Sequence, residues 1–83
     1  MTAPRDRFAV NLREARKAAK ISQQELGERT DLHRTEISLL ERAGREPRLG
    51  TIIKLASALG VTPESLCIGM SWDEKAQRFK FKK

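Results

Sequence analysis

The stretch QQELGERTDLHRTEISLLER, residues 23–42, decides the fold of this chain. Ser22 stands directly before it, and Glu25 follows Ser22 by three residues. This spacing is typical of a capping box, because the Ser oxygen accepts a free backbone N–H and the Glu can reach back to the cap. A helix is therefore predicted over about residues 23–29.

The residues after this helix predict a tight turn and a second helix. Gly27 stands where two crossing helices have to approach closely, and Asp31 is one of the few residues besides Gly that tolerate a left-handed backbone in a turn. Ile37 and Leu40 are three residues apart, so they fall on one face of a helix over about residues 34–43.

The other face of this second helix is polar and predicts a nucleic-acid contact. Two short helices joined by a tight turn form the helix-turn-helix unit, whose second helix enters the DNA major groove. Arg can bond a guanine edge with two hydrogen bonds, Glu can accept from cytosine N4, and Thr or Leu methyl groups can meet the thymine methyl. The expected base-contacting residues are Arg34, Thr35, Glu36, Ser38 and Leu39.

Helical spacing of apolar residues predicts three further helices around this unit. One runs from about Asp6 to Lys20, one from about residue 49 to Leu59, and a short one follows the Thr62 cap. Gly44 is expected to take the left-handed cap after the second helix of the unit. The residues expected to face the core are Phe8, Leu12, Ala15, Ala19, Ile52, Leu55, Ala56, Leu59, Val61 and Leu66.

The last stretch, residues 68–83, changes from helical spacing to alternation and predicts a β-hairpin. Its apolar face would hold Met70, Trp72, Phe79 and Phe81. A lone hairpin is marginal in water, so this face has to pack on something. A second subunit is the favoured candidate, because symmetric DNA readers commonly bind paired half-sites. The alternatives are a tail that covers the domain's own helices and a disordered tail.

Composition fits one small domain with a polyanionic partner. The chain has 83 residues and a formal net charge of +6, although the charge alone would also serve solubility. The single cysteine, Cys67, excludes an internal disulfide and suits a reducing cytoplasm. No apolar run reaches the ~20 residues that a membrane helix needs. We expect a flexible N-terminal arm over residues 1–5, the helix-turn-helix domain over residues 6–67, and the hairpin beyond it.

Segment 8–66 resembles the lambda-repressor/Cro type of helix-turn-helix domain, the Xre family. The strings that carry the resemblance are SQQELGERTDL, HRTEISLLER, REPRLGTIIKLASALGV and TPESL. The phrase LHRTEIS is also similar to the recognition helix of restriction–modification controller proteins, in which an Arg-Thr pair is common. The resemblance implies an all-α, compact five-helix DNA-binding domain, here with a C-terminal β-hairpin extension.

Several residue roles follow from this resemblance. Arg16 and Glu41 match a family salt bridge that clamps the first helix to the recognition helix, and Gln23 matches a family glutamine that touches the DNA backbone. His33 and Arg48 depart from the family pattern, since small residues usually cap the helices there; Leu39 replaces a residue that is often polar or basic. The expected phosphate-contacting residues are Gln23, His33, Arg42, Arg45 and Arg48, with Asn11, Arg13 and Lys17 as weaker candidates.

The predicted function is sequence-specific regulation of transcription, as a repressor or autoregulator. A dimer would present two recognition helices ~34–36 Å apart to a pseudo-palindromic operator. The alternative is an antitoxin, or another protein-interaction module of the same fold, whose hairpin grips a partner protein. We expect no catalysis, metal or cofactor, because the lone His33 and the lone Cys67 lie in different elements and no phosphate-binding loop or ligand cluster accompanies them.

Overall fold

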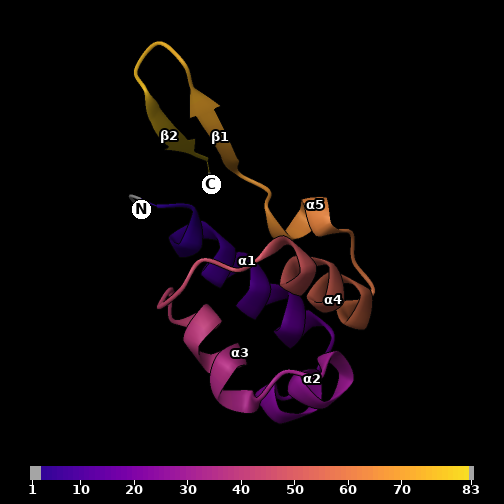
Figure 1. Cartoon of the computed structure of the whole chain (residues 1–83). Helices are drawn as coiled ribbons and strands as arrows, with labels where there is room; N and C mark the ends of the chain where they lie inside the picture. The colour runs from indigo at the N-terminus through magenta and orange to yellow at the C-terminus, as the bar shows by residue number, and fades with distance from the viewer. Residues whose placement is uncertain (1–2, 83) are drawn as a thin grey trace.

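The computed structural model describes residues 3–82 and contains five helices followed by a two-stranded antiparallel hairpin (Figure 1). The all-α class with a C-terminal hairpin is thereby confirmed. The elements are α1 (Pro4–Ala18), α2 (Gln23–Thr30), α3 (Arg34–Glu41), α4 (Leu49–Leu59), α5 (Pro63–Leu66), β1 (Met70–Asp73) and β2 (Arg78–Phe81).

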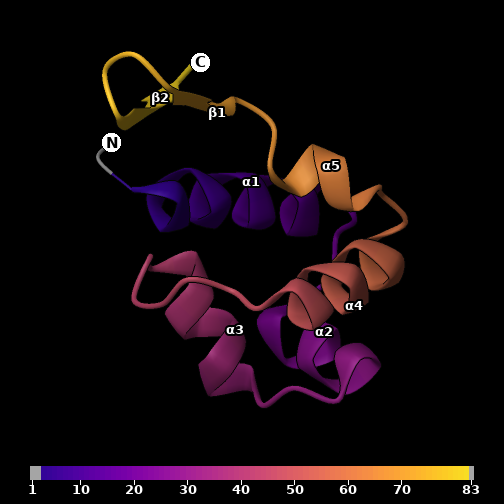
Figure 2. The same ribbon diagram turned by 45° about the horizontal axis from the view of Figure 1, so that its top comes forward.

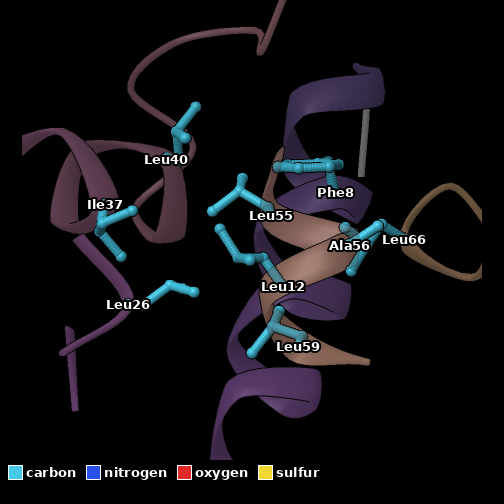
Figure 3. Packing of buried hydrophobic residues seen from close by; sticks show 9 residues of the cluster. All are labelled: Phe8, Leu12, Leu26, Ile37, Leu40, Leu55, Ala56, Leu59 and Leu66. Carbon is cyan, nitrogen blue, oxygen red and sulfur yellow. The ribbon is translucent and has the colours of Figure 1, made fainter. Parts of the chain in front are cut away.

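One core unites the five helices (Figure 3). Most of the apolar residues predicted from helical spacing meet there, since each helix buries one face against the others. Ala19 does not, because α1 ends at Ala18 and Ala19 is exposed. Removing this apolar surface from water is the main stabilising term of a domain this small. The buried cluster consists of Phe8, Leu12, Leu26, Ile37, Leu40, Leu55, Ala56, Leu59 and Leu66.

The helix ends correct several expectations. The first helix begins at Pro4, so residues 4 and 5 of the expected N-terminal arm are helical, and residues 1 and 2 of that prediction lie outside the described residues. Pro suits a first helical position, and the Ala3 N–H donates to Asp6 Oδ2 at 3.0 Å. The recognition helix ends at Glu41 instead of residue 43.

The turn after α3 also differs from the prediction. The left-handed residue is Ala43, with φ of 58°, and not Gly44. Gly44 instead leaves space for Leu39, because a Cβ at this position would come within 2.3 Å of Leu39 Cδ1 and the leucine side chain would have to shift. The Leu39 side chain therefore lies over this turn.

The molecule measures 42 × 21 × 20 Å, and the hairpin extends it along its long axis. In both views it lies beyond α1, on the side away from α2 and α3 (Figures 1 and 2). Met70 pairs with Phe81 and Trp72 with Phe79. Directly opposed residues share a face, so the predicted apolar face of Met70, Trp72, Phe79 and Phe81 forms as expected.

Candidate nucleic-acid interface

The turn between α2 and α3 is fixed by local backbone chemistry. Ser22 Oγ accepts the Glu25 N–H at 3.0 Å, which confirms the predicted cap, although the Glu25 carboxylate pairs with Arg29. Asp31 takes the left-handed conformation with φ of 60°. A Cβ on Gly27 would approach the Leu32 carbonyl oxygen to 2.6 Å, so only glycine lets the two helices come this close.

His33 caps the N-terminus of α3. Its Nδ1 accepts the Thr35 N–H at 3.1 Å and lies 2.8 Å from Thr35 Oγ1. A neutral imidazole that accepts at Nδ1 carries its proton on Nε2, so the ring also holds an outward donor. His33 stands where Ser or Thr normally caps this helix in the family, and sequence reasoning missed that its ring nitrogen can replace a hydroxyl oxygen as the cap.

The predicted base-contacting residues are distributed unevenly over α3. Arg34 and Thr35 are exposed on its first turn. Glu36 is partly exposed and lies 4.0 Å from Arg45 across the following loop, while Ser38 Oγ accepts from Arg42 Nε at 3.4 Å. Two of the predicted base-contacting residues, Glu36 and Ser38, therefore contact two of the predicted phosphate-contacting residues, Arg45 and Arg42.

Leu39 lies at the margin of this surface. Its side chain is only partly exposed, because it covers Gly44 and the turn after α3. Arg34 and Thr35, at the opposite end of the helix, have no such cover. The open end of α3 is thus its N-terminal turn.

A buried ion pair fastens α3 to α1. Glu41 is 4% exposed; its Oε2 accepts from Arg16 Nε at 2.6 Å and its Oε1 accepts from Arg16 Nη2 at 3.0 Å. Arg16 Nη1 also donates to the Ile21 carbonyl oxygen at 2.9 Å. The hydrogen bonds to Glu41 raise the pKa of Arg16. This two-pronged geometry fixes orientation as well as adding energy.

Gln23 joins the same network. Its Nε2 donates to Glu41 Oε1 at 3.1 Å, so the first residue of α2 is tied to the last residue of α3. Arg13 Nη1 donates to the Glu41 carbonyl oxygen at 3.3 Å. Two residues considered as phosphate contacts thus hold helix ends in position, a role that sequence reasoning did not assign to them.

The loop between α3 and α4 carries two exposed arginines, Arg45 and Arg48. Arg48 is the N-cap residue of α4 and makes no side-chain cap hydrogen bond. The free N–H groups of that helix end and the guanidinium group are both suited to an anion.

Asn11 turns away from this surface. Its Nδ2 donates to the carbonyl oxygens of Leu66 and Ile68, each at 3.0 Å. Beside it, Arg7 Nη2 donates to the carbonyl oxygen of Lys82. These two side chains of α1 therefore hold the root of the hairpin, and the weak phosphate role considered for Asn11 gives way to a structural one.

Within residues 3–82, no cluster of His, Cys, Asp or Glu has the grouping that a metal ion needs. Among the same residues, no helix is both long and apolar enough to cross a membrane.

Five helices around one core, with an exposed α3 after a tight turn, define a helix-turn-helix domain of the lambda-repressor type. A family model described as Helix-turn-helix matches residues 12–66. The chain belongs to this family, which consists of transcription regulators and not of enzymes.

Individual relatives support this family assignment. The chain is 42% identical to control protein C.BamHI of Bacillus amyloliquefaciens over 60 residues, 71% of this chain and 74% of that protein. The restriction-modification controller protein C.AhdI of Aeromonas hydrophila is 37% identical with a TM-score of 0.72, covering 75% of this chain and 94% of that one. The P22 c2 repressor, solved with a synthetic operator, is 32% identical with a TM-score of 0.69, covering 75% and 94%.

The length match varies between relatives. The chain spans 28% of one curated regulator that it matches and 74% and 70% of two control proteins. The similarity to restriction–modification controllers predicted from LHRTEIS is confirmed by these matches.

Proposed function

We propose that this protein is a sequence-specific DNA-binding regulator that inserts α3 into the major groove. The exposed first turn of α3 carries the proposal, because it presents Arg34 and Thr35 from a backbone fixed on both sides. The operator complex of the related P22 c2 repressor supports it.

Each contact has a role in this arrangement. Arg34 reads a base edge, with Thr35 and Glu36 beside it and Ser38 and Leu39 toward the margin. The outward Nε2–H of His33 donates to a phosphate. Arg42, Arg45 and Arg48 meet the sugar–phosphate edge, and Gln23 contributes from the N-terminus of α2 while it holds Glu41.

Glu36 and Arg45 exchange partners on binding. Their ion pair, at 4.0 Å and with both side chains partly exposed, is weak enough to open. Arg45 then turns to a phosphate and Glu36 becomes free to accept from a cytosine amine. Before it opens, the pair offsets the negative charge of the Glu36 carboxylate, which would otherwise repel the DNA backbone as the two molecules approach.

The protein acts as a homodimer on a pseudo-palindromic operator in the cytoplasm, as a repressor or autoregulator. Its hairpin face of Met70, Trp72, Phe79 and Phe81 forms the dimer contact. The antitoxin alternative is not favoured, because the named relatives are control proteins and a repressor.

Selection of binding sites from a random duplex pool tests this function, with wild type compared with Arg34→Ala. We expect the wild type to enrich a palindrome with half-sites about one helical turn apart. Loss of Arg34 should cost about 1–3 kcal/mol, roughly 5- to 150-fold in affinity, and relax one base position in each half-site.

Lys75→Ala is the matched control, because it removes one positive charge at the hairpin turn, away from α3 (Figure 1). It should retain the preferred sequence. Only salt-sensitive binding without an enriched sequence would contradict the proposed function.

A further inference from the structure

The hydroxyl group of Thr35 lies against the residue that caps α3. Thr35 Oγ1 is 2.8 Å from His33 Nδ1, and the same nitrogen accepts the Thr35 N–H at 3.1 Å. Two groups of one residue therefore converge on a single ring nitrogen. Because Nδ1 accepts the backbone N–H through its lone pair, it carries no hydrogen of its own in the neutral imidazole.

This arrangement fixes the direction of the Thr35 hydroxyl hydrogen. An oxygen and a nitrogen 2.8 Å apart are at hydrogen-bond distance, and their lone pairs would repel each other without a hydrogen between them. Nδ1 has no hydrogen to give, so the O–H of Thr35 donates to His33. Within residues 3–82, the structure gives this hydroxyl no other hydrogen-bond partner.

A hydroxyl that donates inward presents only acceptors outward. Thr35 is exposed on the first turn of α3, and its oxygen keeps its lone pairs for a group that approaches from outside. In the major groove, the matching donors are adenine N6 and cytosine N4. Guanine O6 and N7, thymine O4 and the phosphate oxygens are acceptors, so none of them can pair with this oxygen.

Ser38, one turn further along α3, has the opposite polarity. Arg42 Nε donates to Ser38 Oγ at 3.4 Å, and the hydrogen of the Ser38 hydroxyl has no acceptor among the described residues. Ser38 can therefore donate where Thr35 can only accept. The neighbours of these two hydroxyl groups, and not the hydroxyl chemistry itself, decide what each one can read.

We propose that His33 is a specificity-determining residue, because it makes Thr35 a hydrogen-bond acceptor only. The inference rests on the proposed function and deepens it. Each base pair places one amino base, adenine or cytosine, and one keto base, thymine or guanine, in the major groove. Thr35 Oγ1 therefore decides which strand carries the amino base at the position that it meets. His33 is a positioning residue in this role, since it contacts no base.

Two substitutions at His33 separate the acceptor atom from the rest of the ring. In His33→Asn, the new Oδ1 takes a position close to that of Nδ1 and can accept both the N–H and the O–H of Thr35. In His33→Gly no side-chain acceptor remains, although glycine is tolerated as a helix cap. The Thr35 hydroxyl can then rotate and donate outward.

Selection from a random duplex pool, followed by affinity measurements on single-base variants of the selected site, tests the proposal. Thr35→Val keeps the shape of the side chain without the hydroxyl, so the position whose preference changes is the one that Thr35 meets. There the wild type should favour adenine or cytosine over guanine or thymine by roughly fivefold, the worth of one net hydrogen bond. His33→Gly should reduce this preference to about twofold or less, and His33→Asn should retain it.

Thr62→Gly is the matched control for His33→Gly. Thr62 caps α5 by accepting the Ser65 N–H at 3.2 Å, so the control also replaces a cap by glycine, but outside the helix-turn-helix unit. It should leave every base preference unchanged. A buffer of about pH 8 keeps an ordinary imidazole neutral, and far-UV circular dichroism verifies that every variant is folded.

Three outcomes would overturn the proposal: a wild-type preference for guanine or thymine at the Thr35 position, an unchanged preference in His33→Gly, or equal relaxation in His33→Asn and His33→Gly. An enriched sequence that Thr35→Val leaves unchanged at every position would also overturn it, because Thr35 would then read no base, while the proposed function would stand. Failure of the proposed function is distinct, since the wild type would then enrich no sequence at all.

Discussion

The helical domain and the hairpin of this molecule are stabilised in different ways. Every residue of the buried apolar cluster comes from the helices, whereas Trp72 and Phe79 of the hairpin remain about half exposed. The hairpin is joined to α1 largely through backbone carbonyl groups bound by Arg7 and Asn11. Apolar burial thus sets the shape of the domain, and a few hydrogen bonds set the direction of the hairpin.

The largest expected effect lies in the helical domain, at Glu41. Glu41→Ala leaves the Arg16 guanidinium and the Gln23 amide without their shared acceptor, at a site where Glu41 is only 4% exposed. Removing one partner of a buried pair costs about 3–5 kcal/mol, and we expect about 3 kcal/mol because Arg16 keeps some solvent. Urea unfolding measures the loss.

Glu25→Ala is the matched control for this variant. The Glu25–Arg29 pair is largely exposed, so its loss should cost less than about 1 kcal/mol. Similar losses in both variants would show that the Glu41 network does not clamp the recognition helix.

Much of the helical domain was predictable because its determinants are local in sequence. Ser22 and Thr62 accept nearby backbone N–H groups through their side chains, and Asp31 takes the left-handed conformation, as expected. Helix ends were less predictable: Ala43 adopts the left-handed conformation while Gly44 makes room for Leu39, and this choice depends on packing.

The joint between domain and hairpin could not be predicted. Asn11 and Arg7 bind carbonyl groups that lie 55 to 75 residues away in the chain. A carbonyl acceptor has no signature in the sequence, because every residue carries one. The alternation of Met70, Trp72, Phe79 and Phe81 therefore revealed the hairpin and its apolar face, but not the direction in which it stands.

A smaller effect is expected at His33, where the cap and the proposed phosphate contact can be separated. His33→Ala should destabilise the protein by about 1 kcal/mol because the Thr35 N–H loses its acceptor. His33→Asn should retain stability, since Asn is a good cap, and should still lose affinity for DNA.

Thermal unfolding and the affinity for DNA measure the two roles of His33. A neutral imidazole neutralises no phosphate charge, so its loss should lower the affinity while the slope of log K against log salt stays that of wild type. If His33→Asn keeps the affinity of wild type, His33 serves α3 only as a cap.

The smallest effect on stability, and the sharpest comparison of the two regions, is expected at Asn11. Asn11→Asp keeps the shape of the side chain but cannot donate to the Leu66 and Ile68 carbonyl groups. One of these hydrogen bonds is exposed and the other is partly buried, so the loss in stability should be about 1 kcal/mol. The direction of the hairpin, in contrast, should become less defined.

Operators with altered half-site spacing reveal that loss of direction. One inserted base pair rotates one half-site by about 34° relative to the other. A dimer with rigid hairpins should lose about tenfold in affinity for this operator, while the Asn11→Asp dimer should discriminate only a few-fold between the two spacings. Glu14→Ala, an exposed change on the same helix, is the control and should discriminate like wild type. Full discrimination by Asn11→Asp would mean that α1 does not set the distance between the two recognition helices, and that the hairpin keeps its direction through Met70 and the packing beneath it.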